Sequence, residues 1–225
     1  MKFIKPHNFI SSGVKAFFTT KTTGNNFYEP LKESGFPEDS IYMPLQKHTD
    51  SVMILEDDFK PQIADAILTE RKGVLIGVQV ADCVPVLLLD EGKSVIGAVH
   101  AGWRGTSSGI LKKTINAMKE KFGSSAEDIL VAIGPSIRQC CYNVGDEVKD
   151  AVHMATGEGG YFSKRDEKYL IDLSNANRIQ ALAAGVLEKN IWQSEECTFC
   201  KPAKFHSFRY AKDRAGRQGG FIGMI

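Results

Sequence analysis

The chain has 225 residues, of which 43% are hydrophobic and 24% charged, enough to build one domain with a sizeable core. Its 28 Lys+Arg and 27 Asp+Glu leave a formal charge of +1, which argues against a broad nucleic-acid-binding surface. No apolar run is long enough to cross a bilayer, and residues 1–10 do not resemble a secretory signal. Five scattered cysteines do not form a disulfide pattern. We therefore expect a single domain over residues 1–225 of a cytoplasmic protein without nucleic-acid or membrane partners.

Residues 12–46 are rich in Gly, Pro and Asn and predict mostly loop. Short apolar runs of strand type follow at residues 52–55, 74–80, 84–89, 95–99 and 129–133. Several of these runs are apolar on successive residues, which predicts sheets that are covered on both faces.

Two helices are expected. The first follows Ser107 and Ser108, whose hydroxyls are candidate caps, and ends near Phe122 before a glycine. The second covers about residues 174–187, with Asp172 or Ser174 as the cap. Its predicted buried stripe consists of Ile179, Leu182, Ala183 and Val186. Strands mixed with a few helices predict the α/β (α+β) class, as a layered sandwich of mixed β-sheets flanked by helices.

A cysteine and a histidine are predicted to meet across a hairpin. If Glu91 and Gly92 form a two-residue turn, the ladder that continues from it places Cys83 directly opposite His100. Opposed residues lie close enough to share one metal ion or one proton. Pro85 is the weak point of this ladder, because proline donates no backbone hydrogen bond.

This pair allows three interpretations. Thiolate and imidazole are zinc ligands, and a third ligand with an open fourth position would make a catalytic site. Without a metal, His100 could activate Cys83 as a nucleophile. Both residues could equally be ordinary core residues. His48 is the candidate third ligand, although its spacing from the other two does not establish that the three converge.

The segment after His100 predicts an anion site. Glycines ahead of a helix start expose backbone N–H groups, so we expect Gly105, Thr106 and the guanidinium of Arg104 to bind phosphate. A basic tail over residues 201–217 is typical of a solvated surface, but Arg209 could reach a phosphate or nucleoside. The pair Cys197 and Cys200 has metal or redox spacing but no evident partner pair, and the default role for the adjacent Cys140 and Cys141 is as core or loop thiols.

Several motifs together resemble the YfiH-like family, described as laccase-domain or multicopper polyphenol oxidase-like proteins. They are QKHTD (46–50), ADAILT (64–69), ADCVPVLL (81–88), HAGWRGT (100–106), IGPSI (133–137) and CYNVGDEV (141–148). The resemblance implies layered mixed sheets related to a toxin deamidase domain. It also implies a zinc ion bound by His48, Cys83 and His100, which would then be the catalytic residues.

The family's activities imply a purine nucleoside phosphorylase that acts on adenosine, inosine and methylthioadenosine, with adenosine deaminase activity alongside. Asp65 or Asp82 would orient groups or assist proton transfer. Two departures from the family concern substrate binding. The N-terminal region looks short: FFTTKTTG (17–24) resembles a family segment, but the usual serine-leucine-asparagine stretch and the helix before the Q-x-H motif are hard to find. Tyr210 stands where the family has the second arginine of an Arg-Arg pair.

The hypothesis is therefore a zinc-dependent phosphorylase whose partners are a purine nucleoside and phosphate, and which is a monomer or weak homodimer. The first alternative is a metal-independent Cys–His hydrolase or amidase that edits peptidoglycan precursors. The second is a copper-dependent polyphenol oxidase, with Cu²⁺ in place of Zn²⁺. Five histidines in the whole chain fit poorly with several copper ions.

Overall fold

The computed structural model describes residues 3–9, 13–21 and 29–225. Residues 22–24 of the segment FFTTKTTG lie outside this part, as do residues 12 and 22–28 of the predicted loop. The described part of residues 12–46 is not all loop, because residues 14–19 and 41–42 form strands. No helix within the described residues is both long and apolar enough to cross a membrane.

The strands form three sheets of mixed direction. The five-stranded sheet has the order β1 (Phe3–Ile4), β2 (Val14–Thr19), β14 (Gln218–Met224), β6 (Leu75–Val80), β3 (Ile41–Tyr42). The six-stranded sheet has the order β13 (Ile191–Gln193), β9 (Leu130–Ile133), β7 (Val84–Asp90), β8 (Val95–Ala101), β5 (Ala66–Thr69), β4 (Val52–Ile54). The small sheet has the order β10 (Asn143–Val144), β12 (Lys168–Ile171), β11 (Phe162–Arg165).

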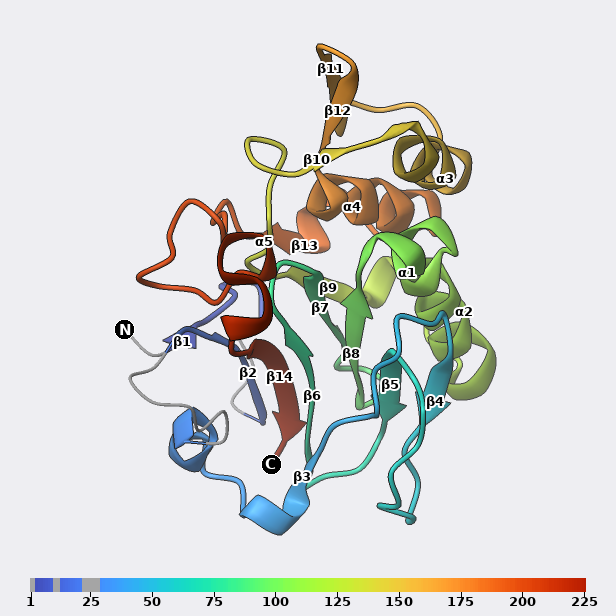
Figure 1. The fold of residues 1–225 in the computed structure, drawn as a ribbon. Helices are drawn as coiled ribbons and strands as arrows, with labels where there is room; N and C mark the ends of the chain where they lie inside the picture. The colour runs from blue at the N-terminus through green and yellow to red at the C-terminus, as the bar shows by residue number, and fades with distance from the viewer. Residues whose placement is uncertain (1–2, 10–12, 22–28) are drawn as a thin grey trace.

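The helices are α1 (Trp103–Ser107), α2 (Ile110–Phe122), α3 (Asp146–Thr156), α4 (Leu173–Ala183) and α5 (Phe208–Ala211). Short 3-10 turns are η1 (Glu29–Ser34), η2 (Glu38–Ser40), η3 (Ala126–Asp128), η4 (Glu188–Asn190) and η5 (Lys212–Arg214). Helices α1 to α4 gather on one side of the six-stranded sheet, and the five-stranded sheet lies on its other side (Figure 1). The predicted layered, mixed α+β sandwich is thus confirmed.

The central strands are buried on both faces, as their continuous apolar runs predict. In β7, Val86 and Leu88 pack in the cluster beneath the helices. The alternate residues Leu87 and Leu89 pack between the two sheets. Because side chains alternate along a strand, a strand covered on both faces has no polar positions in its pattern. All five predicted strand runs correspond to strands, β4, β6, β7, β8 and β9.

The predicted register of the β7–β8 hairpin is wrong by two residues. The structure pairs Pro85 with His100, and Asp90 with Val95, around a four-residue loop at 91–94. The loop is held by the Asp90 carboxylate, which accepts from the Lys93 backbone, and Ser94 has a left-handed φ of 53°. A shift of two residues keeps side chains on the same face of a strand, so Cys83 still lies on the side of His100.

Pro85 fits the central strand because its nitrogen points away from β8. The His100 N–H donates to the backbone carbonyl of Asp65, the residue before β5, rather than to β7. Pro85 and His100 therefore form a non-hydrogen-bonded pair. On the other side, the Pro85 carbonyl accepts from Gly134, just beyond the last paired residue of β9, Ile133. The proline therefore lies where a donor is not needed.

The two predicted helices are corrected in detail. The first is divided into α1 and α2 at Gly109, whose φ is 69°, and neither Ser107 nor Ser108 caps α2. The second is α4, and its predicted cap is confirmed because the Asp172 carboxylate accepts from the Asn175 backbone at 3.0 Å.

The predicted buried stripe of α4 is correct in part. Val186, just beyond the helix, is buried and Ile179 packs against the core, but Ala183 is exposed. The polar residues Asn177 and Gln180 are buried. Both amides donate to Thr106, one to its hydroxyl and one to its carbonyl. Since α4 packs partly through these amides, an apolar pattern could not locate its buried face.

Candidate metal centre

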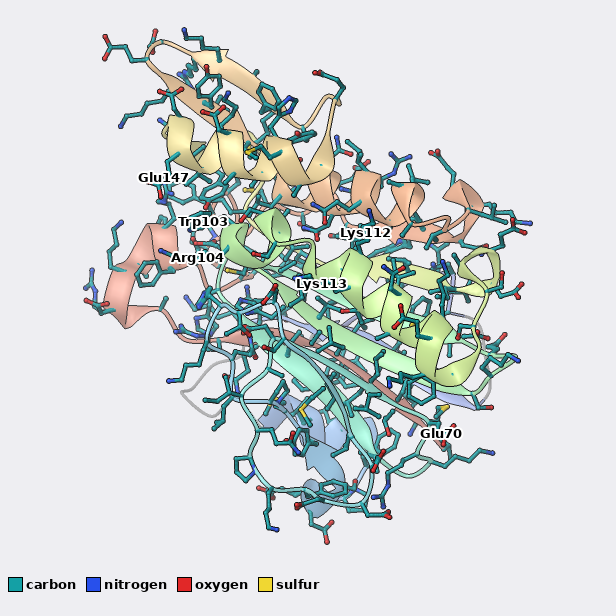
Figure 2. All side chains as sticks on the ribbon, turned by 90° about the vertical axis from the view of Figure 1, so that its right-hand side faces the viewer. Glu70, Trp103, Arg104, Lys112, Lys113 and Glu147 are labelled. Atoms are coloured by element: carbon teal, nitrogen blue, oxygen red, sulfur yellow. The ribbon has the colours of Figure 1, made fainter. Side chains whose placement is uncertain are left out.

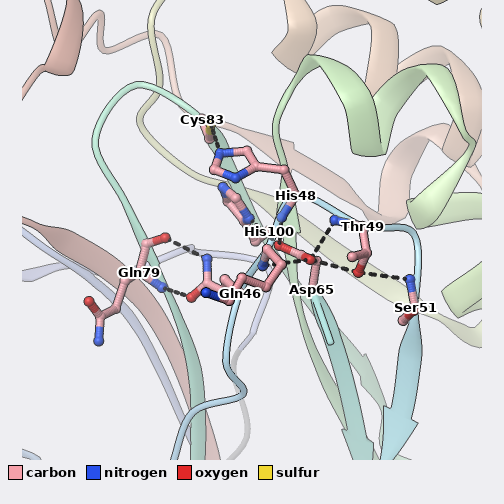
Figure 3. Close-up of polar contacts among 9 residues, drawn as sticks. Gln46, His48, Thr49, Ser51, Asp65, Gln79, Cys83 and His100 are labelled. Atoms are coloured by element: carbon pink, nitrogen blue, oxygen red, sulfur yellow. Dashed lines mark hydrogen bonds and ion pairs between the residues drawn. The ribbon is translucent and has the colours of Figure 1, made fainter. Parts of the chain in front are cut away.

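Three side chains from distant parts of the chain meet at one end of the two-sheet sandwich. His48 lies in the loop after β3, Cys83 in the turn between β6 and β7, and His100 near the end of β8. Their ligating atoms all lie within 4.8 Å of one another. The Cys83 Sγ is 4.0 Å from the His48 Nε2, and the two imidazole rings have centroids 4.8 Å apart (Figure 3). The sequence prediction that these residues form one cluster agrees with this geometry.

Asp65 holds both histidines in place. Its carboxylate is fully buried and accepts from the His100 Nδ1 at 2.7 Å. The same carboxylate accepts from the His48 backbone, and from the backbone and hydroxyl of Thr49 (Figure 3). With its Nδ1 engaged, His100 has its Nε2 available for a ligand. Asp65 is therefore an orienting residue, one of the two roles that the sequence suggested for it.

A second anchor fixes the loop that carries His48. The Gln46 side chain donates to the Gln79 carbonyl at 2.8 Å and accepts from the Gln79 backbone at 2.7 Å (Figure 3). His48 itself adopts a left-handed φ of 58°, a conformation that is uncommon for a residue with a side chain. Such a conformation persists where surrounding contacts determine it, and Gln46 and Asp65 supply them here.

The cluster is strongly polarised. Burial would raise the pKa of Cys83, but the charges and hydrogen bonds of His100 and His48 lower the pKa to about 6. Burial would lower the pKa of His100, but the Cys83 thiolate and Asp65 raise it to about 9. Burial also opposes ionisation of Asp65, yet its bonds to His100 and Thr49 hold its pKa well below the usual range. At neutral pH the metal-free cluster is thus a thiolate beside an imidazolium.

Asp82, the other carboxylate that the sequence suggested, serves as an anchor. It is buried, with a φ of 91°, and accepts from the Thr198 hydroxyl at 2.6 Å and the Ser207 hydroxyl at 3.0 Å. It also accepts from the Arg209 backbone at 2.7 Å. Asp82 therefore holds the C-terminal segment against the turn that carries Cys83.

A cavity of about 820 Å³ opens over the three ligating residues. Its apolar lining includes Trp103, Ile137, Tyr142, Leu173 and Phe208. Its cationic lining consists of Lys47, Arg104, Arg209, Lys212 and Arg217. Within the described part of the chain, the only carboxylate that lines the cavity is Asp82, which already accepts three hydrogen bonds. The cavity therefore combines apolar walls with an excess of positive charge.

The predicted anion-binding residues separate into two groups. Arg104 lines the cavity and stacks over Trp103 with its guanidinium carbon 4.4 Å from the ring centroid, on the side of the helical layer that faces α5 (Figure 2). Arg209 also lines it and stacks over Tyr142 at 5.1 Å. Gly105 and Thr106 are buried and are not among the lining residues. The Thr106 hydroxyl accepts from Asn177 and its N–H donates to Gly102, so a contact of these two residues with phosphate stays a prediction without support from this geometry.

Sequence reasoning missed part of the lining. Lys212 and Arg217 belong to the basic tail that looked like a solvated surface, yet both line the cavity. Tyr142 carried no signal of its own, and burial and the negative charge of Cys83 raise its pKa to about 12. Its phenol therefore stays neutral at physiological pH. The anchoring of the tail by Asp82 connects residues more than a hundred positions apart, which no local pattern reveals.

A fold of layered mixed sheets with a two-histidine, one-cysteine cluster beneath a cationic cavity defines the chain as a candidate metal-binding enzyme. Residues 19–225 match the family model described as multi-copper polyphenol oxidoreductase laccase, and the chain belongs to that family. The expected YfiH-like membership is thereby confirmed.

Two similar proteins match this chain over most of its length. The chain is 38% identical over 192 residues to a purine nucleoside phosphorylase of Aquifex aeolicus, and this match covers 85% of each of the two chains. It is 32% identical to the adenosine deaminase RL5 of an unknown prokaryotic organism, over 91% of this chain and 92% of that one. The crystal structure of YlmD from Geobacillus stearothermophilus superposes with a TM-score of 0.92 at 29% identity, over 100% of this chain and 96% of that one.

Gly102 provides a test of the cluster's tight packing. A Cβ at this position would lie 3.0 Å from the Cys83 Sγ and 3.2 Å from the His48 Cδ2, although the backbone φ of −73° suits any residue. We expect Gly102→Ala to weaken zinc binding about tenfold, as changes beside metal ligands do. The matched control is Gly145→Ala, whose Cβ would meet nothing within 4 Å. Equal zinc affinity of the two variants, measured by competition with a chromophoric chelator, would contradict this account.

Cys83 should be the most reactive thiol of the metal-free protein. Because its pKa is about 6, most of it is thiolate at pH 7, and only thiolates react with iodoacetamide. Mass spectrometry of peptides should show faster labelling of Cys83 than of Cys140, whose pKa burial and neighbouring thiols raise to about 11. Zinc should protect Cys83. If Cys83 is labelled slowly until the pH exceeds 8, its pKa is not lowered and it has no imidazolium partner in His100.

Proposed function

We propose that this protein is a zinc-dependent purine nucleoside phosphorylase that converts a nucleoside and phosphate into the free base and ribose 1-phosphate. The observation that carries the proposal is the position of the His48–Cys83–His100 cluster at the base of a cavity with apolar walls and a cationic rim. The phosphorylase name of relatives that match most of the chain supports it.

The three residues fit a zinc ion by the chemistry of their donors. Zinc takes imidazole nitrogen and thiolate sulfur, and tetrahedral bonds of about 2.0 and 2.3 Å would set these atoms about 3.5 Å apart. The observed 4.0 Å between the His48 Nε2 and the Cys83 Sγ is near this value. Three protein ligands leave a fourth position open, as in catalytic zinc sites. Zinc bound there would supply a Lewis acid that polarises a water or substrate oxygen.

The cationic side of the cavity suits the phosphate co-substrate. Arg104 and Arg209 are held by stacking on Trp103 and Tyr142, so their planar guanidinium groups are oriented before phosphate binds. Fixed donors of this kind bind phosphate oxygens and would hold the negative phosphate beside the positive charge that develops on the sugar. Lys212 lines the cavity two residues after Tyr210, the position where the family has an arginine. We infer that Lys212 replaces part of its charge.

The apolar side of the cavity suits the purine and ribose. Trp103, Tyr142 and Phe208 offer aromatic surfaces on which a base can stack. The neutral phenol of Tyr142 can donate a hydrogen bond to an oxygen or ring nitrogen of the substrate. The cavity volume is in the range of small-molecule sites.

Adenosine deamination is a second candidate, favoured by the similarity to a relative named adenosine deaminase. It needs only a water beside the ligand cluster and no phosphate. Release of ammonia from adenosine in phosphate-free buffer would separate it from phosphorolysis. A copper polyphenol oxidase is less well supported, because several copper ions need more histidines than the two of this cluster.

The phosphorylase proposal predicts that inosine and phosphate yield hypoxanthine and ribose 1-phosphate. Cys83→Ala should abolish this activity, and a chelator should suppress wild-type activity until zinc is added back. The measurement is base release followed by chromatography. Activity that survives both the chelator and Cys83→Ala would contradict it. Activity that survives the chelator but not the substitution would favour the metal-independent Cys–His hydrolase.

The role of Lys212 gives a separate prediction. Lys212→Ala should raise the KM for phosphate about tenfold, the effect of losing one charge-assisted contact. The KM for inosine and the bound zinc should stay near wild type. Arg214→Ala is the matched control, because it removes an equal charge from an exposed neighbour that does not line the cavity. If both variants raise the KM equally, the effect is the net charge of the segment and Lys212 does not contact phosphate.

A further inference from the structure

Two pairs of cysteines that are distant in the sequence meet behind the wall of the cavity. Cys140 and Cys141 follow β9, and Cys197 and Cys200 follow β13. All four sulfur atoms lie within 4.8 Å of one another. The Cys200 Sγ is 3.6 Å from the Cys140 Sγ and 3.2 Å from the Cys141 Sγ. Cys197 and Cys200 have no evident partner pair in the sequence pattern, and the structure supplies one. We call these four residues the thiol cluster.

We propose that the thiol cluster binds a second zinc ion and is a structural tetrathiolate site. Four zinc–sulfur bonds of about 2.3 Å in a tetrahedron place the sulfurs about 3.8 Å apart. The separations of 3.6 and 3.2 Å are slightly shorter than this value, and no pair of the four sulfurs is more than 4.8 Å apart. Cys-x-x-Cys supplies two ligands in many structural zinc sites, and the site is complete when a second pair of thiols faces the first.

The backbone around the thiol cluster is fixed independently of any ion. Ser136 and Cys197 form a parallel β-bridge, and the Thr198 N–H donates to the Ser136 carbonyl at 3.0 Å. The Cys141 N–H donates to the Arg138 carbonyl at 2.9 Å, which closes the turn that carries both adjacent cysteines.

A disulfide explains the thiol cluster less well. All five cysteines lie in the described part of the chain, and all are free thiols. The 3.6 and 3.2 Å separations both involve Cys200, so only one of these two contacts could become a disulfide, whereas one ion uses all four sulfurs. Zinc suits the arrangement better than a metal with strict geometric demands, because its filled d shell imposes no ligand-field preference on adjacent ligands such as Cys140 and Cys141.

The thiol cluster would fasten two segments of the cavity wall to each other. Tyr142, directly after Cys141, lines the cavity. Thr198, directly after Cys197, donates to Asp82 beside Cys83. An ion at the thiol cluster would therefore stabilise the wall without facing the cavity, and all four of its coordination positions would be filled by protein sulfur. That is the composition of a structural zinc site rather than a catalytic one.

The test is the number of zinc ions in the reduced, full-length protein, counted by mass spectrometry of the metal against the protein concentration. We expect two for the wild type and one for His48→Ala, which removes an exposed ligand of the other cluster and leaves the thiol cluster intact. X-ray absorption of His48→Ala should show zinc with four sulfur neighbours at about 2.3 Å. Cys200→Ser should retain one zinc, now with nitrogen neighbours.

Three outcomes would overturn the proposal. His48→Ala could contain no zinc, or its remaining zinc could show nitrogen ligands. Iron in the thiol cluster, visible by colour and metal content, would replace zinc in the assignment. A Cys141–Cys200 disulfide in protein that was never exposed to oxidants, detected by peptide mass mapping without reduction, would show that the cluster is not a metal site. Because His48→Ala answers the question with the thiol cluster unchanged, misfolding of Cys200→Ser would not affect the result. None of these results depends on phosphorylase activity.

Discussion

The geometry of the metal centre depends on one buried carboxylate. Asp65 accepts five hydrogen bonds, from the backbone of Lys47, His48 and Thr49, from the Thr49 hydroxyl and from His100. A carboxylate without partners would be too costly to bury, but here the donors outweigh desolvation and keep Asp65 ionised. The same bonds fix the loop that carries His48 and select the tautomer of His100. One side chain thus converts two remote histidines into neighbours.

Asp82 performs the corresponding task for the opposite wall of the cavity. It joins the turn before Cys83 to Ser207 and Arg209 near α5, and to Thr198 beside the thiol cluster. These bonds hold the cationic tail over the cluster together with the pairing of His206 and Gln218. Each buried carboxylate therefore brings a different distant segment to the site. The two candidate histidine ligands are held by Asp65, and Asp82 holds Arg209 against the turn that carries Cys83.

The sequence predicted what local patterns and motifs determine. Continuous apolar runs identified the doubly covered strands, and Asp172 was recognised as a cap because capping is a short-range interaction. The hairpin register was missed by two residues because the Asp90 side chain builds a four-residue loop that resembles a tighter turn. The buried face of α4 was located only in part, because Asn177 and Gln180 pack through hydrogen bonds. Lys212 and the thiol cluster were missed because they depend on convergence between remote segments, which leaves no periodic signal.

The two clusters of ligating residues differ in what they leave open. The two imidazoles and one thiolate of the first would fill only three positions of a tetrahedral ion, and the cluster lies beneath a cavity with a cationic rim. The second offers four cysteine sulfurs, which would saturate the same ion and exclude a reactant. A reactive metal centre needs an open coordination position and rigid surroundings. The His48–Cys83–His100 cluster would supply the open position, and the thiol cluster would stabilise the surrounding wall. Tyr142 and Thr198 connect the two clusters. Tyr142 lines the cavity and follows Cys141 of the thiol cluster. Thr198 donates to Asp82 and follows Cys197 of the thiol cluster.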